Sequence, residues 1–419
     1  MAVQLSNYTN ALQKVIMPYI RDNFPKNTIL LDQIKRNSDV TFLNDNFYAP
    51  IRTSRHGGIV NLANDGNSLV TGSSSVGQAS VGVKILTGTF DISKLAIDAT
   101  KSNKGAVVSA LSFQAKTLTS DFAKNVNRQY YSDGLGILSQ VAGSVGAATA
   151  SVMLPDAGGT ANDARLVDAY GTVNGDISPT EYLFPGMVVG FGSAAGSGVG
   201  TISSVTGTSI VLTGALPAAV AGSQVIYALD GSGGGAGTSE IQGMRAALSS
   251  STGTSTYAGV ARSTTGWTPQ VNSTAEALTL SAMESSYLQA RKYAQMGDRY
   301  AIFVNVTLYK RYGDLLTSMR RSVNETDLLG GWTGLEFAVG GGKVGVFLDY
   351  DVPDGEVIIC NLDSWTVAQV GDMDWLESPD GGSMLRSANK ITYQTAMVWF
   401  TNLICVAPAA NGRLTRKTA

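Results

Sequence analysis

The sequence predicts an α+β fold of several domains, with an inserted small antiparallel β-barrel. Apolar residues recur every three or four positions over residues 104–131, which predicts one long helix. Short runs rich in β-branched and aromatic residues, bounded by Gly, Pro and Asn, predict strands before and after that helix. Residues 141–238 differ from their surroundings, because they contain six acidic residues and a single basic one, Arg165.

Length and composition describe a chain with a large core and few charges. The 419 residues suffice for two or three compact domains, and 44% of them are apolar. Only 15% are charged, against about 25% in ordinary soluble proteins. We therefore expect much of the weakly charged surface to meet copies of the same chain. The net charge of −2 gives no overall basic character that would indicate tight nucleic-acid binding.

Nothing in the hydropathy pattern predicts a membrane segment. The longest apolar run, residues 397–406, is interrupted by Thr401 and Asn402 and is far shorter than the roughly 20 residues of a membrane span. Residues 1–10 have neither a basic start nor an apolar run, so no signal peptide is expected. We expect a soluble intracellular product with no membrane partner.

The residue types that catalysis and metal binding use are scarce. His56 is the single histidine, and a structural or subunit contact is expected for it. The sequence contains no phosphate-binding loop and no nucleophile elbow. The glycine cluster 231–237 is interpreted as a linker, and Asp372 and Asp374 as a solvated loop in preference to a metal site. We expect no catalytic residue, no metal and no cofactor.

The two cysteines, Cys360 and Cys405, each lie in an apolar, β-branched run. Free cysteine packs as a small hydrophobic residue, so both are expected to be buried free thiols. A disulfide is not expected in a cytoplasmic protein.

The first part of the chain predicts an arm and a hairpin. Residues 1–47 are expected to form an extended arm with short helices, and residues 47–92 a long two-stranded hairpin with a mobile, Gly- and Ser-rich tip. An isolated ribbon is marginal in water, so we expect it to dock on a neighbouring subunit. The candidate inter-subunit residues of the tip are Asn64, Asp65, Gly66, Asn67, Gly72 and Gly77.

The predicted helix over residues 104–131 should lie along a sheet and end at Gly134. Its apolar face consists of Val108, Leu111, Ala115, Leu118, Phe122, Val126 and Tyr130. Its charged residues are expected away from that face, and they include Lys116, Asp121, Lys124 and Arg128.

The second half of the chain predicts the insert and a mixed α and β region. Within the insert, β-prone runs occur at residues 187–189, 200–202, 209–212 and 224–227. After the linker, the expected elements are a helix over 273–295, a strand over 300–304, a helix over 308–319, a hairpin over 343–360 and a final β run over 391–407.

The order of these parts resembles the major capsid proteins of tailed bacteriophages, the Hong Kong 97-like capsid fold, over nearly the whole chain. Arm, hairpin loop, long spine helix, axial domain and peripheral strands follow one another in the family's order, although no single string is diagnostic. The strings that carry the resemblance are Phe47-Tyr48-Ala49-Pro50-Ile51-Arg52, Arg55-His56-Gly57-Gly58, Leu86-Thr87-Gly88-Thr89-Phe90-Asp91-Ile92-Ser93, Tyr131-Ser132-Asp133-Gly134 and Phe347-Leu348-Asp349-Tyr350-Asp351-Val352-Pro353-Asp354-Gly355.

The resemblance implies a structural subunit and not an enzyme. It implies self-assembly into hexamers and pentamers of an icosahedral phage head, formed in the bacterial cytoplasm and enclosing double-stranded DNA through non-specific contacts. No long charged helical segment precedes the arm, so a separate scaffolding protein is expected, with portal and decoration proteins as further partners. The implied parts are an arm (1–47), an extended loop (48–92), a peripheral domain with the spine helix (93–140), the insert (141–238), an axial domain (239–370) and peripheral return strands (371–419).

Three alternatives stay open at the level of sequence. An encapsulin-like compartment shell has the same fold and packages enzymes in place of DNA. Lys84 is the loop lysine that some family members cross-link to a neighbour's asparagine, although a solvated lysine is the simpler interpretation. The basic tail, residues 413–417, is either a contact for packaged DNA or a frayed terminus.

Overall fold

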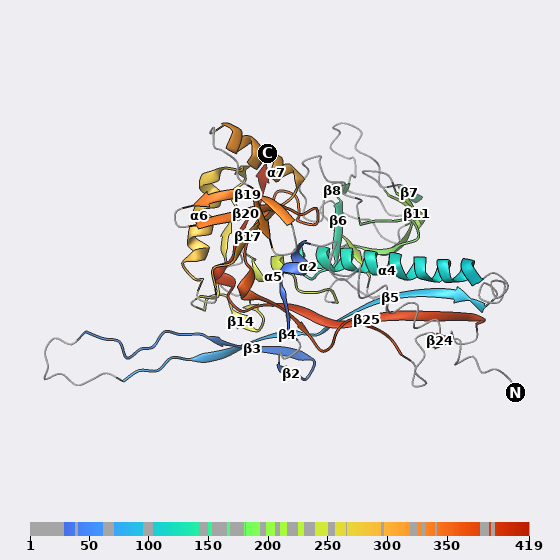
Figure 1. Ribbon diagram of the computed structural model, residues 1–419, viewed down its shortest axis with the longest axis horizontal. Coiled ribbons are helices and arrows are strands. Elements are labelled where there is room, and N and C mark those ends of the chain that lie inside the picture. Colours follow the sequence, from blue (N-terminus) through green and yellow to red (C-terminus); the bar gives the residue numbers. More distant parts are fainter. Residues whose placement is uncertain are drawn as a thin grey trace.

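The structure, a computed structural model, is an elongated body with a long hairpin projecting from one end (Figure 1). Most of its elements are strands, in agreement with a mixed α and β class. The residues that it describes are 29–37, 41–61, 71–94, 104–141, 150–152, 166–167, 180, 182–192, 198–205, 210–215, 225–229, 239–249, 256–264, 266–294, 297–318, 325–328, 332–339, 342–377, 385–386 and 390–418.

The projecting hairpin consists of β3 (Asn46–Arg52) and β4 (Val76–Gly82), with β2 (Thr41–Leu43) on the other edge of β3. The cross-strand partners Phe47 and Val81 are buried in the main core at its base. The hairpin predicted over residues 47–92 is thus confirmed for its first part. The prediction is wrong beyond β4, because the next strand pairs with a C-terminal strand and not with the hairpin.

That next strand, β5 (Lys84–Ser93), lies beside the long C-terminal strand β25 (Thr392–Cys405), and both run beneath α4 (Figure 1). Ten residue pairs join them, from Lys84 opposite Thr401 to Ser93 opposite Thr392. The same sheet contains β1 (Lys35–Asn37), β22 (Trp365–Gln369), β23 (Asp374–Trp375) and β24 (Leu385–Arg386), and α2 (Ile29–Gln33) precedes β1.

The long helix α4 spans Lys104–Tyr131, as predicted. Gly134 follows it with a φ of +81°, in the left-handed region that ends many helices. The helix lies so close to β5 that a Cβ on Gly88 would stand 3.0 Å from Leu118 Cδ1. A glycine at this position therefore permits the helix to approach the sheet.

The faces of α4 follow the predicted pattern. Phe122 and Val126 are buried, and Lys124 is exposed, as expected. Arg128, which was expected away from the apolar face, differs from Lys124 because it is buried, at 6% exposed. Its guanidinium forms an ion pair with the Glu240 carboxylate, so the last turn of the helix is buried on the side that carries Arg128.

The insert, which begins earlier than the predicted residue 141 because β6 starts at Ile137, forms a seven-stranded sheet of antiparallel pairs with its own hydrophobic core. The strand order is β7 (Ala150–Val152), β11 (Ile210–Ala215), β10 (Gly198–Val205), β9 (Val188–Gly192), β12 (Val225–Ala228), β6 (Ile137–Val141) and β8 (Leu166–Val167). Strands β9 to β12 confirm the four predicted β runs. Closure into a barrel stays a prediction, since β7 and β8 are the two ends of this order.

A second seven-stranded sheet, with α6 (Leu280–Arg291) and α7 (Val306–Ser318) packed on it, lies beside the insert, on the side of the body toward which the hairpin projects (Figure 1). Its strand order is β15 (Gln270–Asn272), β26 (Gly412–Leu414), β21 (Val357–Asn361), β17 (Tyr300–Val304), β20 (Gly342–Leu348), β19 (Trp332–Val339) and β18 (Glu325–Leu328).

Two expectations for this region are wrong. Residues 343–360 do not form a hairpin, because the fully buried β17 lies between β20 and β21 and pairs with both. The helix predicted over 273–295 begins later, at Leu280, where the Thr279 hydroxyl accepts a hydrogen bond from the Ala282 N–H at 3.2 Å.

The C-terminal tail is part of the fold, so the interpretation as a frayed terminus is wrong. Arg413 lies in β26, and Lys417 lies in β27 (Lys417–Thr418), which pairs with β16 (Glu276–Ala277). Both side chains are buried, and their charges are paired with Glu356 and Glu276. The remaining short elements are α5 (Met244–Ala247), β13 (Thr256–Tyr257), β14 (Val260–Ala261) and the 3₁₀ turns Leu362–Ser364 and Pro408–Ala410.

Candidate assembly surfaces

The hairpin continues as a ribbon beyond the last regular pair of β3 and β4. The Thr53 N–H donates to the Ser75 carbonyl at 3.0 Å, and the Ser75 N–H donates to the Ser54 hydroxyl at 2.9 Å. The Gly57 N–H reaches the Ser73 carbonyl at 3.4 Å. The two segments of the ribbon, before and after its tip, therefore stay hydrogen-bonded to each other well outside the body of the subunit.

Apolar side chains on this ribbon lie in solvent. Ile59 is 86% exposed and Val76 is 73% exposed, while Val60 is 46% exposed. Exposed apolar residues that gather on a projecting element are typical of a surface that a partner covers.

The predicted tip residues fall into two groups. Asn64, Asp65, Gly66 and Asn67 lie outside the described residues. Gly72 is exposed and crosses Gly58 so closely that a Cβ on it would stand 2.1 Å from the Gly58 nitrogen. Gly77, opposite Ile51 in the ladder and next to the Thr53 side chain, is half-buried. The ribbon thus needs glycine where its two chains cross, and the contact role of these residues stays a prediction.

Lys84 is the first residue of β5 and lies opposite Thr401 of β25. Its side chain is half-buried, and burial lowers the pKa of its amine below the usual value. A lowered pKa increases the neutral, nucleophilic fraction of the amine. A cross-link through Lys84 stays a prediction.

A second candidate contact surface lies on the sheet formed by β5 and β25. Ile85 and Phe400 are cross-strand partners that are 59% and 43% exposed. Val370, 48% exposed, donates its N–H to the Phe400 carbonyl at 3.1 Å. Three apolar side chains thus project from neighbouring positions, and we call this group the β5–β25 patch.

A buried polar junction joins α4 to the loop after β20 and to the insert. The Tyr131 hydroxyl donates to Asp349 at 3.0 Å, and the Tyr182 hydroxyl of the insert donates to Asp351 at 2.6 Å. The Asn127 amide donates to both carboxylates. This junction fixes the positions of three parts of the chain relative to one another.

Asp349 is the titratable group of this junction. Burial, together with the charge of Asp351, raises the pKa of its carboxyl to about 6, against hydrogen bonds from Asn127 and Tyr131 that act in the opposite direction. Because the folded-state pKa lies above the unfolded value near 3.8, protonation favours the folded state. The resulting stability is fully present below about pH 4 and is lost as the pH rises through about 6.

We expect Asp349→Asn to reduce the loss of stability between pH 4 and pH 6. A shift of about two units corresponds to roughly 3 kcal/mol in the native chain. The measurement is the urea midpoint as a function of pH for the variant and the native protein. Asp314→Asn, which changes an exposed carboxylate on α7, is the control and should keep the native slope. An unchanged slope in Asp349→Asn would show that this carboxyl titrates normally.

A second buried charge cluster holds the C-terminal strand. Arg413 donates to both Glu356 oxygens at 3.0 and 2.8 Å, and Arg245 lies 3.0 Å from the same carboxylate. Arg413 also donates to the Leu248 carbonyl at 3.1 Å. The Arg413 guanidinium and the Glu356 carboxylate are therefore buried together, and the partly exposed Arg245 adds a second positive charge beside them.

The remaining candidate residues from the sequence are either buried, bonded within their own turn or exposed. Cys360 and Cys405 are buried free thiols, as predicted, and burial raises the pKa of the Cys405 thiol to about 12. His56 Nδ1 accepts the Gly58 N–H at 3.1 Å within its own turn. Asp372 and Asp374 are exposed, and no cluster of potential metal ligands occurs in the described ranges.

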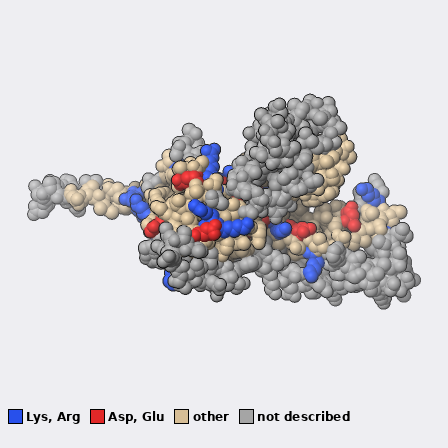
Figure 2. Space-filling model, turned by 90° about the horizontal axis from the view of Figure 1, so that it is seen from above, with Lys and Arg blue, Asp and Glu red and all other residues tan. Residues whose placement is uncertain are grey.

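The charged surface is mixed in sign. Figure 2 shows small groups of acidic and basic side chains among neutral ones on the face that it presents, with no broad basic area among the described residues of that face. No helix in the part of the chain that the structure describes is long and apolar enough to span a membrane.

No protein-family model and no curated protein matches the sequence. Among solved structures, the chain is similar to one in the cyanophage A-1(L) capsid asymmetric unit, with 12% identity, a TM-score of 0.49, and 97% of this chain and 93% of that chain covered. A chain of the Mycobacterium phage Bobi structure has 6% identity, a TM-score of 0.41, and coverage of 93% and 91%. The virus-like particle from Pyrococcus furiosus has 10% identity, a TM-score of 0.37, and coverage of 97% and 99%. All three TM-scores lie below 0.5. A function for this chain therefore has to be inferred from its own residues and contacts.

Proposed function

We propose that the chain is a structural shell subunit that assembles with its own copies through the projecting hairpin. The observation that carries the proposal is the outer part of the hairpin from the Arg52–Val76 pair onward, where Val76 and Ile59 are exposed although the hairpin base is buried in the core. A ribbon of this kind gains order mainly by lying on another surface, where burial offsets the cost of fixing its backbone. The low charge content of the chain agrees with a surface that copies cover.

The specific form of the shell follows from the family that the sequence resembles. We propose the Hong Kong 97-like capsid fold, assembled as hexamers and pentamers of an icosahedral phage head around double-stranded DNA. A separate scaffolding protein, a portal and decoration proteins are the proposed partners, and the subunit has no proposed catalytic role. An encapsulin-like compartment is distinguished by the contents of purified shells, which would be enzyme in place of DNA.

Size-exclusion chromatography with light scattering tests the assembly itself. The native chain should elute as rings or closed shells at micromolar concentration. A compact monomer over a range of salt concentrations, with a scaffolding protein supplied, contradicts the proposal.

We further propose that the insert is a separable domain on the outer side of the shell. Its core is distinct from the other two clusters, and the Ala228 N–H donates to the Gly136 carbonyl at 2.9 Å, so its two connections lie side by side. The predicted six-part division of the chain agrees with a compact insert of this kind.

Replacing residues 137–228 with a Gly-Ser pair should leave a soluble protein that unfolds cooperatively. The variant loses the hydrogen bond from Tyr182 to Asp351, which costs about 1.5–3 kcal/mol because the acceptor is charged. Thermal unfolding followed by circular dichroism measures this. Insoluble protein would show that the insert belongs to the common core, and a reconstruction with the insert on the inner side of a shell would refute the proposed orientation.

A further inference from the structure

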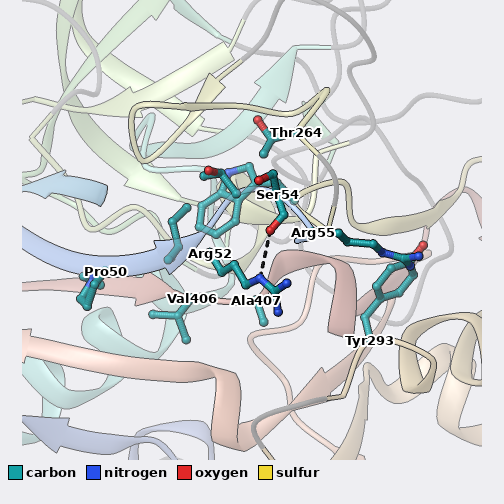
Figure 3. A pocket seen from close by; sticks show the side chains of 13 residues that line it. Pro50, Arg52, Ser54, Arg55, Thr264, Tyr293, Val406 and Ala407 are labelled. Carbon is teal, nitrogen blue, oxygen red and sulfur yellow. Dashed lines mark hydrogen bonds between the residues drawn. The ribbon is translucent and has the colours of Figure 1, made fainter. Parts of the chain in front are cut away.

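A pocket of about 520 Å³ lies at the base of the hairpin (Figure 3). Its lining includes Ile51, Arg52 and Arg55 from the hairpin, Trp267 from the loop after β14, Tyr293 from the end of α6 and Val406 after β25. The lining contains two arginines and no acidic residue. The pocket thus offers positive charge beside apolar and aromatic surface.

This chemistry fits a peptide segment that carries carboxylates next to apolar side chains. Guanidinium groups bind carboxylates with paired hydrogen bonds and also stack on aromatic rings. The Nε of Arg52 donates to the Ser54 carbonyl at 2.9 Å, the bond drawn in Figure 3, which holds this guanidinium at the pocket.

The chain itself exposes such a segment at residues 370–377. Asp372 and Asp374 are exposed, and the apolar residues Val370 and Leu376 that flank them are 48% and 46% exposed. One oxygen of Asp372 accepts from the Gln369 amide at 2.8 Å, and one oxygen of Asp374 accepts from the Trp375 N–H at 2.8 Å. These local bonds orient the two exposed carboxylates, one just before β23 and one at its first residue.

The segment cannot reach the pocket of its own subunit. Asp374 pairs with Val398 in β25, whereas Val406 lines the pocket. At about 3.3 Å per strand residue, the eight residue steps from Val398 to Val406 separate Asp374 from the pocket by roughly 26 Å.

We propose that the pocket binds the 370–377 segment of a second copy, with Arg52 and Arg55 facing Asp372 and Asp374. This inference rests on the proposed shell function and specifies one of its contacts. Two different surfaces meet in such a contact, so it runs head to tail, and head-to-tail contacts close into rings when the rotation allows. Charges at the edge of an interface set its register and its rate of formation.

Charge reversal tests the pairing in the full-length protein. Arg52→Glu with Arg55→Glu, and separately Asp372→Lys with Asp374→Lys, should each lower the fraction that sediments as rings or shells at least tenfold at low salt. The chain with all four substitutions restores opposite charges at every contact and should recover to within about threefold of native. Lys124→Glu with Arg416→Glu, which reverses two exposed cations outside the pocket lining, is the control and should assemble as native.

The outcomes separate the pairing from the assembly. Native assembly of either double variant, or failure of the fourfold variant to recover although its melting temperature is native, overturns the pairing and leaves the shell function standing. Failure of the native chain to assemble overturns both. Since all four substituted residues are exposed, each variant should melt within a few degrees of native.

Discussion

We expect that replacing residues 58–72 with an Asn-Gly turn abolishes the proposed shell closure and leaves the subunit folded. The deleted ribbon ends next to the pair formed by the Gly57 N–H and the Ser73 carbonyl, so a two-residue turn can join its two chains. Among the described residues of the hairpin, the buried ones lie outside the deletion, and Ala79, 0% exposed, is one of them. A deletion extended to residue 80 would remove Ala79 and damage the core.

The effect on assembly is expected to be large. Ile59 and Val60 are lost with the ribbon, and fully burying one such side chain is worth about 1.5–3 kcal/mol, which exceeds a tenfold change in the association constant. Sedimentation measures the assembled fraction, and circular dichroism measures the fold. Normal shells from the shortened chain would refute the role of the ribbon, and unfolded protein would refute its independence from the core.

Single substitutions provide a matched comparison for this deletion. Val60→Asp keeps the length of the ribbon and places a charge on a side chain that is 46% exposed. Leu288→Asp makes the same kind of change on α6, where the side chain is 42% exposed. The first variant should lose assembly and the second should keep it.

Glu356→Gln should lower the free energy of unfolding by about 3–5 kcal/mol, the usual cost of breaking a buried ion pair. The substitution keeps the shape of the side chain and leaves two guanidinium groups, those of Arg413 and Arg245, without a buried counter-charge. Urea unfolding followed by tryptophan fluorescence measures the loss. Glu284→Gln on the exposed side of α6 is the control and should change stability by less than about 0.5 kcal/mol.

A loss below about 1 kcal/mol in Glu356→Gln would show that water or neighbouring carbonyls compensate the two arginines. The tail would then be held mainly by the backbone pairs of β26, which lies between β15 and β21. The size of the effect therefore distinguishes ionic from backbone attachment of the C-terminus.

Local patterns predicted the elements that depend on local forces. The helix over 104–131 follows from its apolar spacing and its terminal glycine, and the strands of the insert follow from β-prone runs. The hairpin over 343–360 was a wrong prediction, because a turn signal cannot reveal that β17, some 40 residues earlier, lies between the two strands.

Long-range pairing also explains the other differences. The spacing of Arg128 places it off the apolar face of the helix but cannot reveal its burial, because its partner Glu240 follows 112 residues later in the chain. The pocket at the hairpin base has no sequence signal, since Arg52, Trp267 and Val406 come from separate parts of the chain. Of the candidate contact surfaces, only the exposed ribbon with its glycines could be expected from composition.

A cryo-electron microscopy reconstruction of the purified native protein tests the central claim most directly. The account predicts closed shells in which each hairpin, from about residue 53 to residue 75, lies across the surface of a neighbouring copy. Particles whose hairpins project into solvent or fold back on their own subunit, or fields that contain monomers alone, would contradict it.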